Sequence, residues 1–150
     1  MISVSHPNRN VKVDLSLTGS KSISNRLLIL KSIYPLLKIK NKSKSRDTFA
    51  LENALKSPTN IKDIGHAGTA MRFLTAYYSI LKGREIILKG STRMHERPIY
   101  PLVDCLKSMG ADINYLRKDG FPPIKIKGKK LNFKRVEISS SVSSQFISAI

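Results

Sequence analysis

The chain has 150 residues, and its 27 Lys and Arg against 10 Asp and Glu give a formal net charge of +17. This length suits one domain or part of a larger protein, and an apolar share of 41% is typical of soluble globular proteins rather than fibres. No apolar run is long enough for a membrane span, the first residues lack a signal peptide's apolar core, and Cys105 is the only cysteine. We therefore expect a cytoplasmic protein without a disulfide framework, a zinc cluster or a membrane segment.

The strong positive charge favours anionic partners through the electric field alone. Nucleic acid, a membrane surface and phosphorylated metabolites all satisfy this condition. A general bias in residue usage, which would spread lysines over solvated faces, also explains the positive charge without any anionic partner. Composition does not choose among these alternatives.

Strand-like and helix-like segments alternate along the first half of the chain. Residues 11–17 alternate apolar and polar side chains, which predicts a strand, and residues 22–33 repeat apolar side chains every three or four positions, which predicts a helix. We expect a second short strand at 37–40 and a second helix at 45–55, ended by the Ser57–Pro58 pair.

The middle of the chain repeats the alternation. A turn of small residues at 65–69 precedes a predicted helix at 71–78, and residues 85–89 form a predicted strand. A loop at 90–97 then leads to a predicted helix at 98–110, because proline suits the first position of a helix and glycine the position after its end.

The last segments complete a mixed fold. A hairpin is predicted from strands at 113–116 and 124–127, followed by a strand at 133–138 and a helix at 142–150. The expected fold class is therefore α/β or α+β, with helices packed on sheets.

A turn of small or hydroxyl residues recurs three times before a predicted helix. Helix N-termini offer free N–H groups and a partial positive charge to an anion, and arginine adds a planar fork for carboxylate or phosphate. Each copy alone is ordinary capping chemistry, but three copies in one chain favour an anion site. The candidate residues are Lys21, Ser22 and Arg26 in the first copy, Gly68, Thr69 and Arg72 in the second, and Ser143, Ser144 and Gln145 in the third.

The loop at 91–98 is a fourth candidate, since it contains two arginines and a glutamate just before a helix. One interpretation is a surface pair between Arg97 and Glu96 with little energetic weight. The other is that Arg93 projects into the same anion pocket.

Four segments are informative as sequence motifs: 17–26 (LTGSKSISNR), 68–72 (GTAMR), 93–99 (RMHERPI) and 141–146 (SVSSQF). In this order they resemble the successive motifs of the EPSP synthase family, the 3-phosphoshikimate 1-carboxyvinyltransferases. The resemblance implies transfer of the enolpyruvyl group of phosphoenolpyruvate to the 5-hydroxyl of shikimate 3-phosphate, releasing phosphate, on the route to aromatic amino acids. It implies neither a metal nor an organic cofactor.

The resemblance also assigns residues to the two substrates. Phosphoenolpyruvate would be contacted by Lys21, Gly68, Arg93 and Gln145, with Lys21 as the catalytic candidate. Shikimate 3-phosphate would be held by Ser22, Arg26, Ser143 and Ser144, and Thr69 and Arg72 would have lesser roles. Both substrates carry several negative charges, so cationic side chains and helix N-termini suit them.

This sequence departs from the family pattern at His66, where asparagine is usual, and at Phe73, where proline often stands. The sequence therefore predicts neither sensitivity nor insensitivity to glyphosate. The resemblance covers only the N-terminal third or so of a family enzyme. It implies that residues 1–19 are a strand and crossover segment, and that residues 20–150 supply about two of the three β/α units of the first domain. The second domain would be absent, so we expect no turnover from this chain alone. The resemblance also implies that the full-length enzyme is a monomer.

Two alternatives remain open. Enolpyruvyl transfer to a UDP-sugar uses a related fold, but its lysine motif continues differently after Lys21. A basic nucleic-acid-binding module is suggested by the stretches 38–46 and 125–135, although these lack a recognisable binding motif and contain few aromatic residues for base stacking. We therefore expect phosphorylated metabolites rather than nucleic acid or a membrane as partners.

Overall fold

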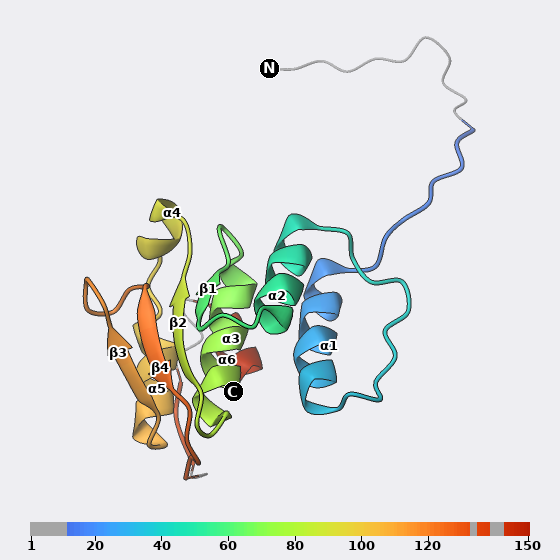
Figure 1. Cartoon of the computed structure of the whole chain (residues 1–150). Helices are drawn as coiled ribbons and strands as arrows, with labels where there is room; N and C mark the ends of the chain where they lie inside the picture. The colour runs from blue at the N-terminus through green and yellow to red at the C-terminus, as the bar shows by residue number, and fades with distance from the viewer. Residues whose placement is uncertain (1–11, 133–134, 139–142) are drawn as a thin grey trace, which may run out of the picture.

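The computed structural model describes residues 12–132, 135–138 and 143–150, and they build helices around one sheet (Figure 1). In chain order the elements are α1 (Lys21–Ile33), α2 (Arg46–Lys56), β1 (Ile61–Asp63), α3 (Gly68–Ile80), β2 (Glu85–Lys89), α4 (Thr92–His95), α5 (Tyr100–Ser108), β3 (Asp112–Tyr115), β4 (Ile124–Lys127) and α6 (Gln145–Ala149). The predicted mixture of helices and strands is confirmed.

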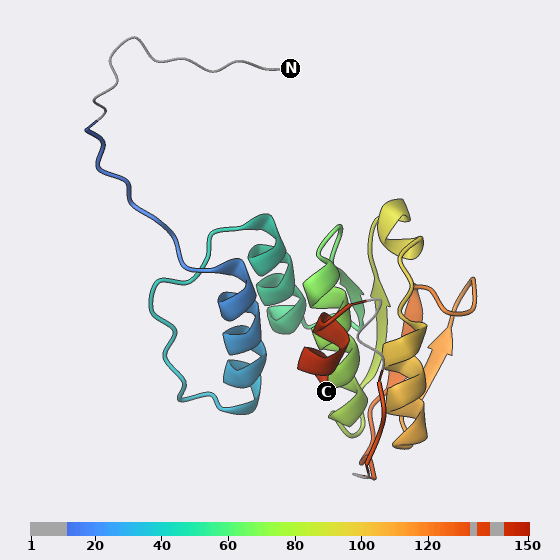
Figure 2. The same ribbon diagram turned by 180° about the vertical axis from the view of Figure 1, so that it is seen from behind.

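The four strands are ordered β1-β2-β4-β3. β1 and β2 run parallel, and α3 provides the crossover that parallel strands need, whereas β4 pairs antiparallel with both β2 and β3. Alternate residues of β2 and β4 are buried, and the residues between them face outward. The sheet therefore has one packed face and one open face, and α3 and α5 lie on the packed one (Figure 2).

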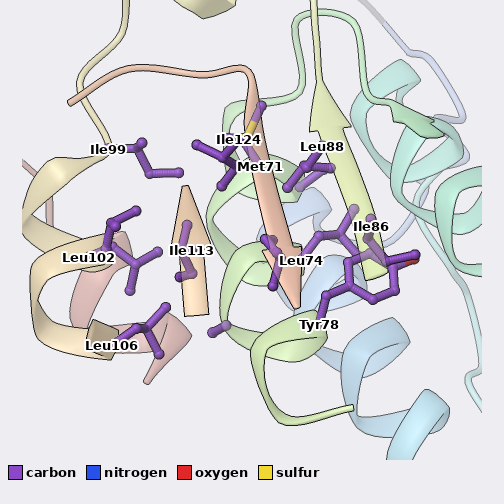
Figure 3. Close-up of a cluster of buried hydrophobic side chains, with 14 of the residues drawn as sticks. Met71, Leu74, Tyr78, Ile86, Leu88, Ile99, Leu102, Leu106, Ile113 and Ile124 are labelled. Atoms are coloured by element: carbon purple, nitrogen blue, oxygen red, sulfur yellow. The ribbon is translucent and has the colours of Figure 1, made fainter. Parts of the chain in front are cut away.

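Helix α3 is the centre of the packing. Nearly all of its residues are buried, because it contacts the sheet on one side and α1, α2 and α6 elsewhere. Figure 3 shows its Met71, Leu74 and Tyr78 side chains among those of the strands, next to the apolar stripe of α5. Residues from every layer thus share one hydrophobic core, which fixes the N-terminus of α3 relative to the strand ends.

Several helix boundaries follow local chemistry. Ser45 caps α2 by accepting the backbone N–H of Thr48 at 3.3 Å, and α2 ends at Lys56, before Pro58, as predicted. The N-terminus of α3 lies three residues before the predicted start at 71. The short β1 was missed, since three residues with a single buried side chain give no periodic signal.

Three strand predictions are wrong. Residues 12–17 of the segment 11–17 form no strand, and Val13, Leu15 and Leu17 are 62–79% exposed, because the described chain offers no neighbouring strand to pair with them. Residues 37–40 form a loop for the same reason. Of the strand predicted at 133–138, residues 135–138 have no regular structure, and residues 133–134 lie outside the described part.

The remaining differences concern helices. The loop predicted at 90–97 contains the one-turn helix α4, and the helix predicted at 98–110 begins only at Tyr100, with Pro101 in its first turn. The final helix is confirmed over Gln145–Ala149, while residues 139–142 lie outside the described part. Among the described residues, no helix has both the length and the apolar character needed to cross a bilayer.

Candidate anion-binding site

The first predicted turn lies at the start of α1. Ser20 caps this helix, its hydroxyl accepting a backbone N–H at 3.5 Å, which leaves Lys21 and Ser22 in an exposed first turn. Lys21 Nζ lies 3.2 Å from Asp47 Oδ2, so the ammonium is directed toward α2. Arg26 donates to the carbonyl oxygen of Ser22 at 3.1 Å, which places Ser22 and Arg26 on one helix face as their spacing predicts.

Arg26 connects three helices. Its Nη2 donates to Ser148 Oγ of α6 at 3.0 Å, and its Cζ lies 5.4 Å from the ring centroid of Phe73 in α3. The helices that carry the three predicted turns therefore meet at one guanidinium. Figure 2 shows α6 lying against α3, and the N-terminal ends of α1 and α3 at the same end of the molecule.

Two arginines gather at the N-terminus of α3. Arg72 Nη1 donates to the carbonyl oxygen of Gly68 at 2.9 Å, and a Cβ placed on Gly68 would lie 2.5 Å from Arg97 Nη1. Ala67, at the cap position, provides no side-chain acceptor for the first N–H groups of the helix. The absence of a side chain at Gly68 thus lets both guanidinium groups approach a helix end that has free donors.

Arg72 carries a buried positive charge. Its side chain belongs to a residue only 5% exposed, and its Nε has no hydrogen-bond partner among the described residues. Burial, and to a lesser extent the neighbouring positive charge of Arg97, lowers the pKa of Arg72 to about 10. No ion pair among the described residues gives Arg72 a carboxylate. A buried, uncompensated guanidinium is costly, so this position favours an anionic ligand.

A hollow of about 540 Å³ lies beside Arg97, and its lining residues are His66, Arg93, Met94 and Arg97. Arg93 is in α4, and Arg97 follows α4 by two residues. Among the ion pairs of the described residues, none joins Arg97 to Glu96. Arg97 is therefore part of the cationic cluster that sequence reasoning attributed to Arg93 alone. The four-residue spacing of Arg93 and Arg97 could have indicated that they lie on the same side of a helical turn. Because this segment was predicted as a loop, the spacing was not used.

The third turn leads into α6. Ser143 Oγ accepts the backbone N–H of Gln145 at 3.2 Å, and the carbonyl oxygen of Ser144 accepts the hydroxyl of Ser148 at 3.4 Å. Thr69 Oγ1 donates to Gln145 Oε1 at 3.4 Å. The structure therefore joins Gln145 directly to the first turn of α3.

These contacts divide the predicted residues into linked groups. Ser22 and Arg26 lie next to α6, Thr69 pairs with Gln145, and Gly68 and Arg72 lie next to Arg97, whereas Lys21 is paired with Asp47. Within the described ranges, His, Cys, Asp and Glu side chains form no group of three suited to a metal ion. The chemistry of the site is that of cationic side chains and helix N-termini.

The family model for EPSP synthase (3-phosphoshikimate 1-carboxyvinyltransferase) matches residues 33–150. This chain belongs to the EPSP synthase family. The sequence resemblance is thereby confirmed at the level of the family.

Named relatives agree with this assignment. The 3-phosphoshikimate 1-carboxyvinyltransferase of Bacteroides fragilis (strain YCH46) is 44% identical over 144 residues, a match covering 93% of this chain and 34% of that protein. The enzyme of the same name from Haemophilus influenzae (strain PittEE) is 41% identical, covering 93% of this chain and 39% of its own length. The chain thus spans between a third and two fifths of the length of these relatives.

A solved structure shows the same fold. EPSP synthase from Acinetobacter baumannii superposes with a TM-score of 0.76 at 22% identity, covering 91% of this chain and 37% of that chain. The mixed α/β architecture of this chain therefore corresponds to part of a larger family fold.

Proposed function

We propose that this chain supplies part of an active site that transfers the enolpyruvyl group of phosphoenolpyruvate to the 5-hydroxyl of shikimate 3-phosphate, with release of phosphate. The single observation that carries the proposal is the buried charge of Arg72 beside Arg97 at the uncapped N-terminus of α3. Phosphate and carboxylate groups are the ligands that such an arrangement stabilises. Family membership supports the choice of these two anionic substrates.

The two substrates would occupy neighbouring parts of the site. On the phosphoenolpyruvate side we place Lys21, Gly68, Arg93 and Gln145, together with Arg97, which the geometry adds. On the shikimate 3-phosphate side we place Ser22, Arg26, Ser143 and Ser144. The contacts of Arg26 with α6 and of Thr69 with Gln145 support this arrangement, since they hold the two sides of the site next to each other.

The residues of this chain would act by binding and by electrostatics. Arg72 and Arg97 would offset substrate charge at the helix end, where Arg72 donates to the carbonyl oxygen of Gly68 and Arg97 lies close to Gly68. Lys21 would exchange its pairing with Asp47 for a substrate anion, which an exposed ion pair permits at small cost. Holding both substrates in one orientation would supply a large part of the rate enhancement.

We also propose the domain organisation implied by the family. Residues 20–150 would form about two of three β/α units, and residues 1–19 would be the strand and crossover segment toward a second domain. The unpaired alternation of Val13, Leu15 and Leu17 supports a strand that finds its partner elsewhere in the longer family fold. The full-length enzyme would be monomeric and cytoplasmic, with no nucleic-acid or membrane partner.

Calorimetric titration of this chain with phosphoenolpyruvate and with shikimate 3-phosphate tests the proposal. We expect binding of at least one of them, and a loss of about 1–3 kcal/mol of its binding free energy in Arg97→Ala. Arg84→Ala is the matched control, because Arg84 is an exposed arginine preceding β2, at the opposite end of this strand from α4. Equal losses in both variants would reject the site. Duplex DNA bound more tightly than either metabolite, with steep salt dependence, would favour the nucleic-acid alternative.

A further inference from the structure

Two loops that border the hollow are fastened to each other. His66 lies in the loop between β1 and α3, and Ser91 follows β2. Ser91 N donates to the carbonyl oxygen of Gly65 at 3.0 Å, and Ile64 N donates to that of Lys89 at 3.0 Å. Gly90 packs so closely that a Cβ there would lie 2.5 Å from the Gly65 oxygen. The backbone on either side of His66 is thus held against the end of β2.

The hydroxyl of Ser91 determines how the imidazole of His66 is oriented. Ser91 Oγ caps α4 by accepting the backbone N–H of Met94 at 3.3 Å, and it lies 2.8 Å from His66 Nδ1. Because the cap uses a lone pair of the hydroxyl, its proton is free to be donated to Nδ1. A neutral ring that accepts at Nδ1 carries its own proton on Nε2. A protonated ring can instead donate from Nδ1 to the remaining lone pair of Ser91, so the same orientation persists in both forms.

We infer that His66 is an anion-binding residue of the hollow, whose Nε2–H donates to the phosphate or carboxylate group held by Arg93 and Arg97, with Ser91 positioning the ring. The inference rests on the anion site proposed above and adds a residue at which this sequence departs from its family. Protonation of His66 adds a positive charge next to the bound anion. An imidazolium at this position therefore binds the anion more tightly than a neutral imidazole does.

Other charged or titratable groups surround the same place. Arg93 and Arg97 keep their charge over the whole range in which histidine titrates. Asp63 and Lys89 form an ion pair at 3.6 Å at the ends of β1 and β2. His95 is the competing histidine, but its Nε2 accepts the backbone N–H of Gly90 at 3.2 Å and is occupied within the fold. A test must therefore separate His66 from His95.

Sulfate is the suitable probe, because it keeps both negative charges between about pH 5.5 and pH 8, where histidine titrates. We expect the intact chain to bind sulfate about three- to fivefold more tightly at the lower pH, the effect of one partly exposed ion pair. His66→Gln should abolish this pH dependence, and the matched control His95→Gln should retain it. Retention in His66→Gln, or its loss only in His95→Gln, would overturn the inference.

The same titration separates this inference from the proposed function. Sulfate binding without pH dependence in the unaltered chain would reject the role of His66 and leave the arginine site standing. If sulfate bound at neither pH, both the role of His66 and the proposed arginine site would be rejected.

The tautomer of His66 provides a second readout. Long-range ¹⁵N–¹H spectra of the neutral ring should show the proton on Nε2, in Ser91→Thr as well as in the unaltered chain. Ser91→Ala removes the donor to Nδ1, so we expect a larger share of the Nδ1–H form and a weaker pH dependence of sulfate affinity. A predominant Nδ1–H form in the unaltered chain would contradict the positioning role of Ser91.

Discussion

The guanidinium of Arg72 lies over the ring of Phe146, with 5.1 Å between Cζ and the ring centroid. Arg72 also donates to the carbonyl oxygen of Gly68, at the start of α3. Helix α6 thus packs its aromatic residue on the arginine that contacts the N-terminus of α3, while Gln145, in the same helix, contacts Thr69. The docking of α6 and the position of Arg72 are therefore coupled.

Phe146→Ala should lower the free energy of unfolding by about 3–5 kcal/mol, because a fully buried aromatic side chain would be replaced by a cavity next to Arg72. Urea denaturation followed by circular dichroism measures the change. Ile147→Ala is the matched control, since Ile147 is the next residue of α6 and is 52% exposed. A loss in the control as large as that in Phe146→Ala would mean that α6 does not dock through Phe146.

Gly68→Ala should retain the fold and weaken anion binding. The added methyl group would collide with Nη1 of Arg97 and Arg72, which are the ends of flexible side chains that can move away. Their displacement from the helix end should cost about 1–3 kcal/mol of binding free energy for phosphoenolpyruvate, measured by calorimetry.

Gly90→Ala provides the contrast to this variant. Its methyl group would meet the backbone oxygen of Gly65 at 2.5 Å and the Met94 side chain at 2.9 Å, so Gly90→Ala should lower the stability of the fold instead.

For Gly68→Ala, an unchanged affinity for phosphoenolpyruvate would mean that the guanidinium groups of Arg72 and Arg97 are not ligands.

The sequence predicted those elements whose signal is local. Ser45 as a cap, Pro58 as a stop and the apolar stripe of α5 are encoded within a single turn or two of helix. Strands depend on a partner that is often distant in the chain, so the alternation of residues 11–17 predicts a strand although its described residues, 12–17, form none. The three residues of β1 show the converse, since pairing with β2 makes them a strand without any pattern of their own.

The candidate site was predictable to a similar extent. The spacing of Ser22 and Arg26 correctly indicated a shared helix face, because four residues make about one turn. The approach of Arg97 to Gly68 depends on how α4 is placed against α3, and no local pattern contains that information. The pairing of Lys21 with Asp47 likewise comes from the packing of α1 on α2.

Glu52 predicts an acid-sensitive contribution to stability. Hydrogen-bonded ion pairs with Lys42 and then Lys56 lower the pKa of Glu52 below its ordinary value of 4.5, although partial burial opposes the shift. A carboxyl group with a lowered pKa stabilises the fold fully above its unfolded pKa, and this stabilisation is lost as the pH falls through the folded pKa.

Glu52→Gln should therefore reduce the free energy of unfolding by about 1 kcal/mol at neutral pH, and the difference should vanish in acid, well below pH 4.5. Urea denaturation across this range checks both points. Glu96→Gln, at an exposed glutamate outside the described ion pairs, serves as the control and should change little. A difference that persisted unchanged in acid would show that Glu52 acts through packing rather than charge.

Arg26→Ala should weaken the binding of shikimate 3-phosphate by roughly 2 kcal/mol or more, because a charge-assisted contact to its phosphate or carboxylate would be lost. The bond from Arg26 to Ser148 shows that the guanidinium already faces α6, where Ser143 and Ser144 lie at the helix start. Lys31→Ala, at an exposed cationic residue in the last turn of the same helix, controls for the loss of one positive charge. Since a general field effect would weaken binding equally in both variants, calorimetry that found equal losses would remove Arg26 from the site.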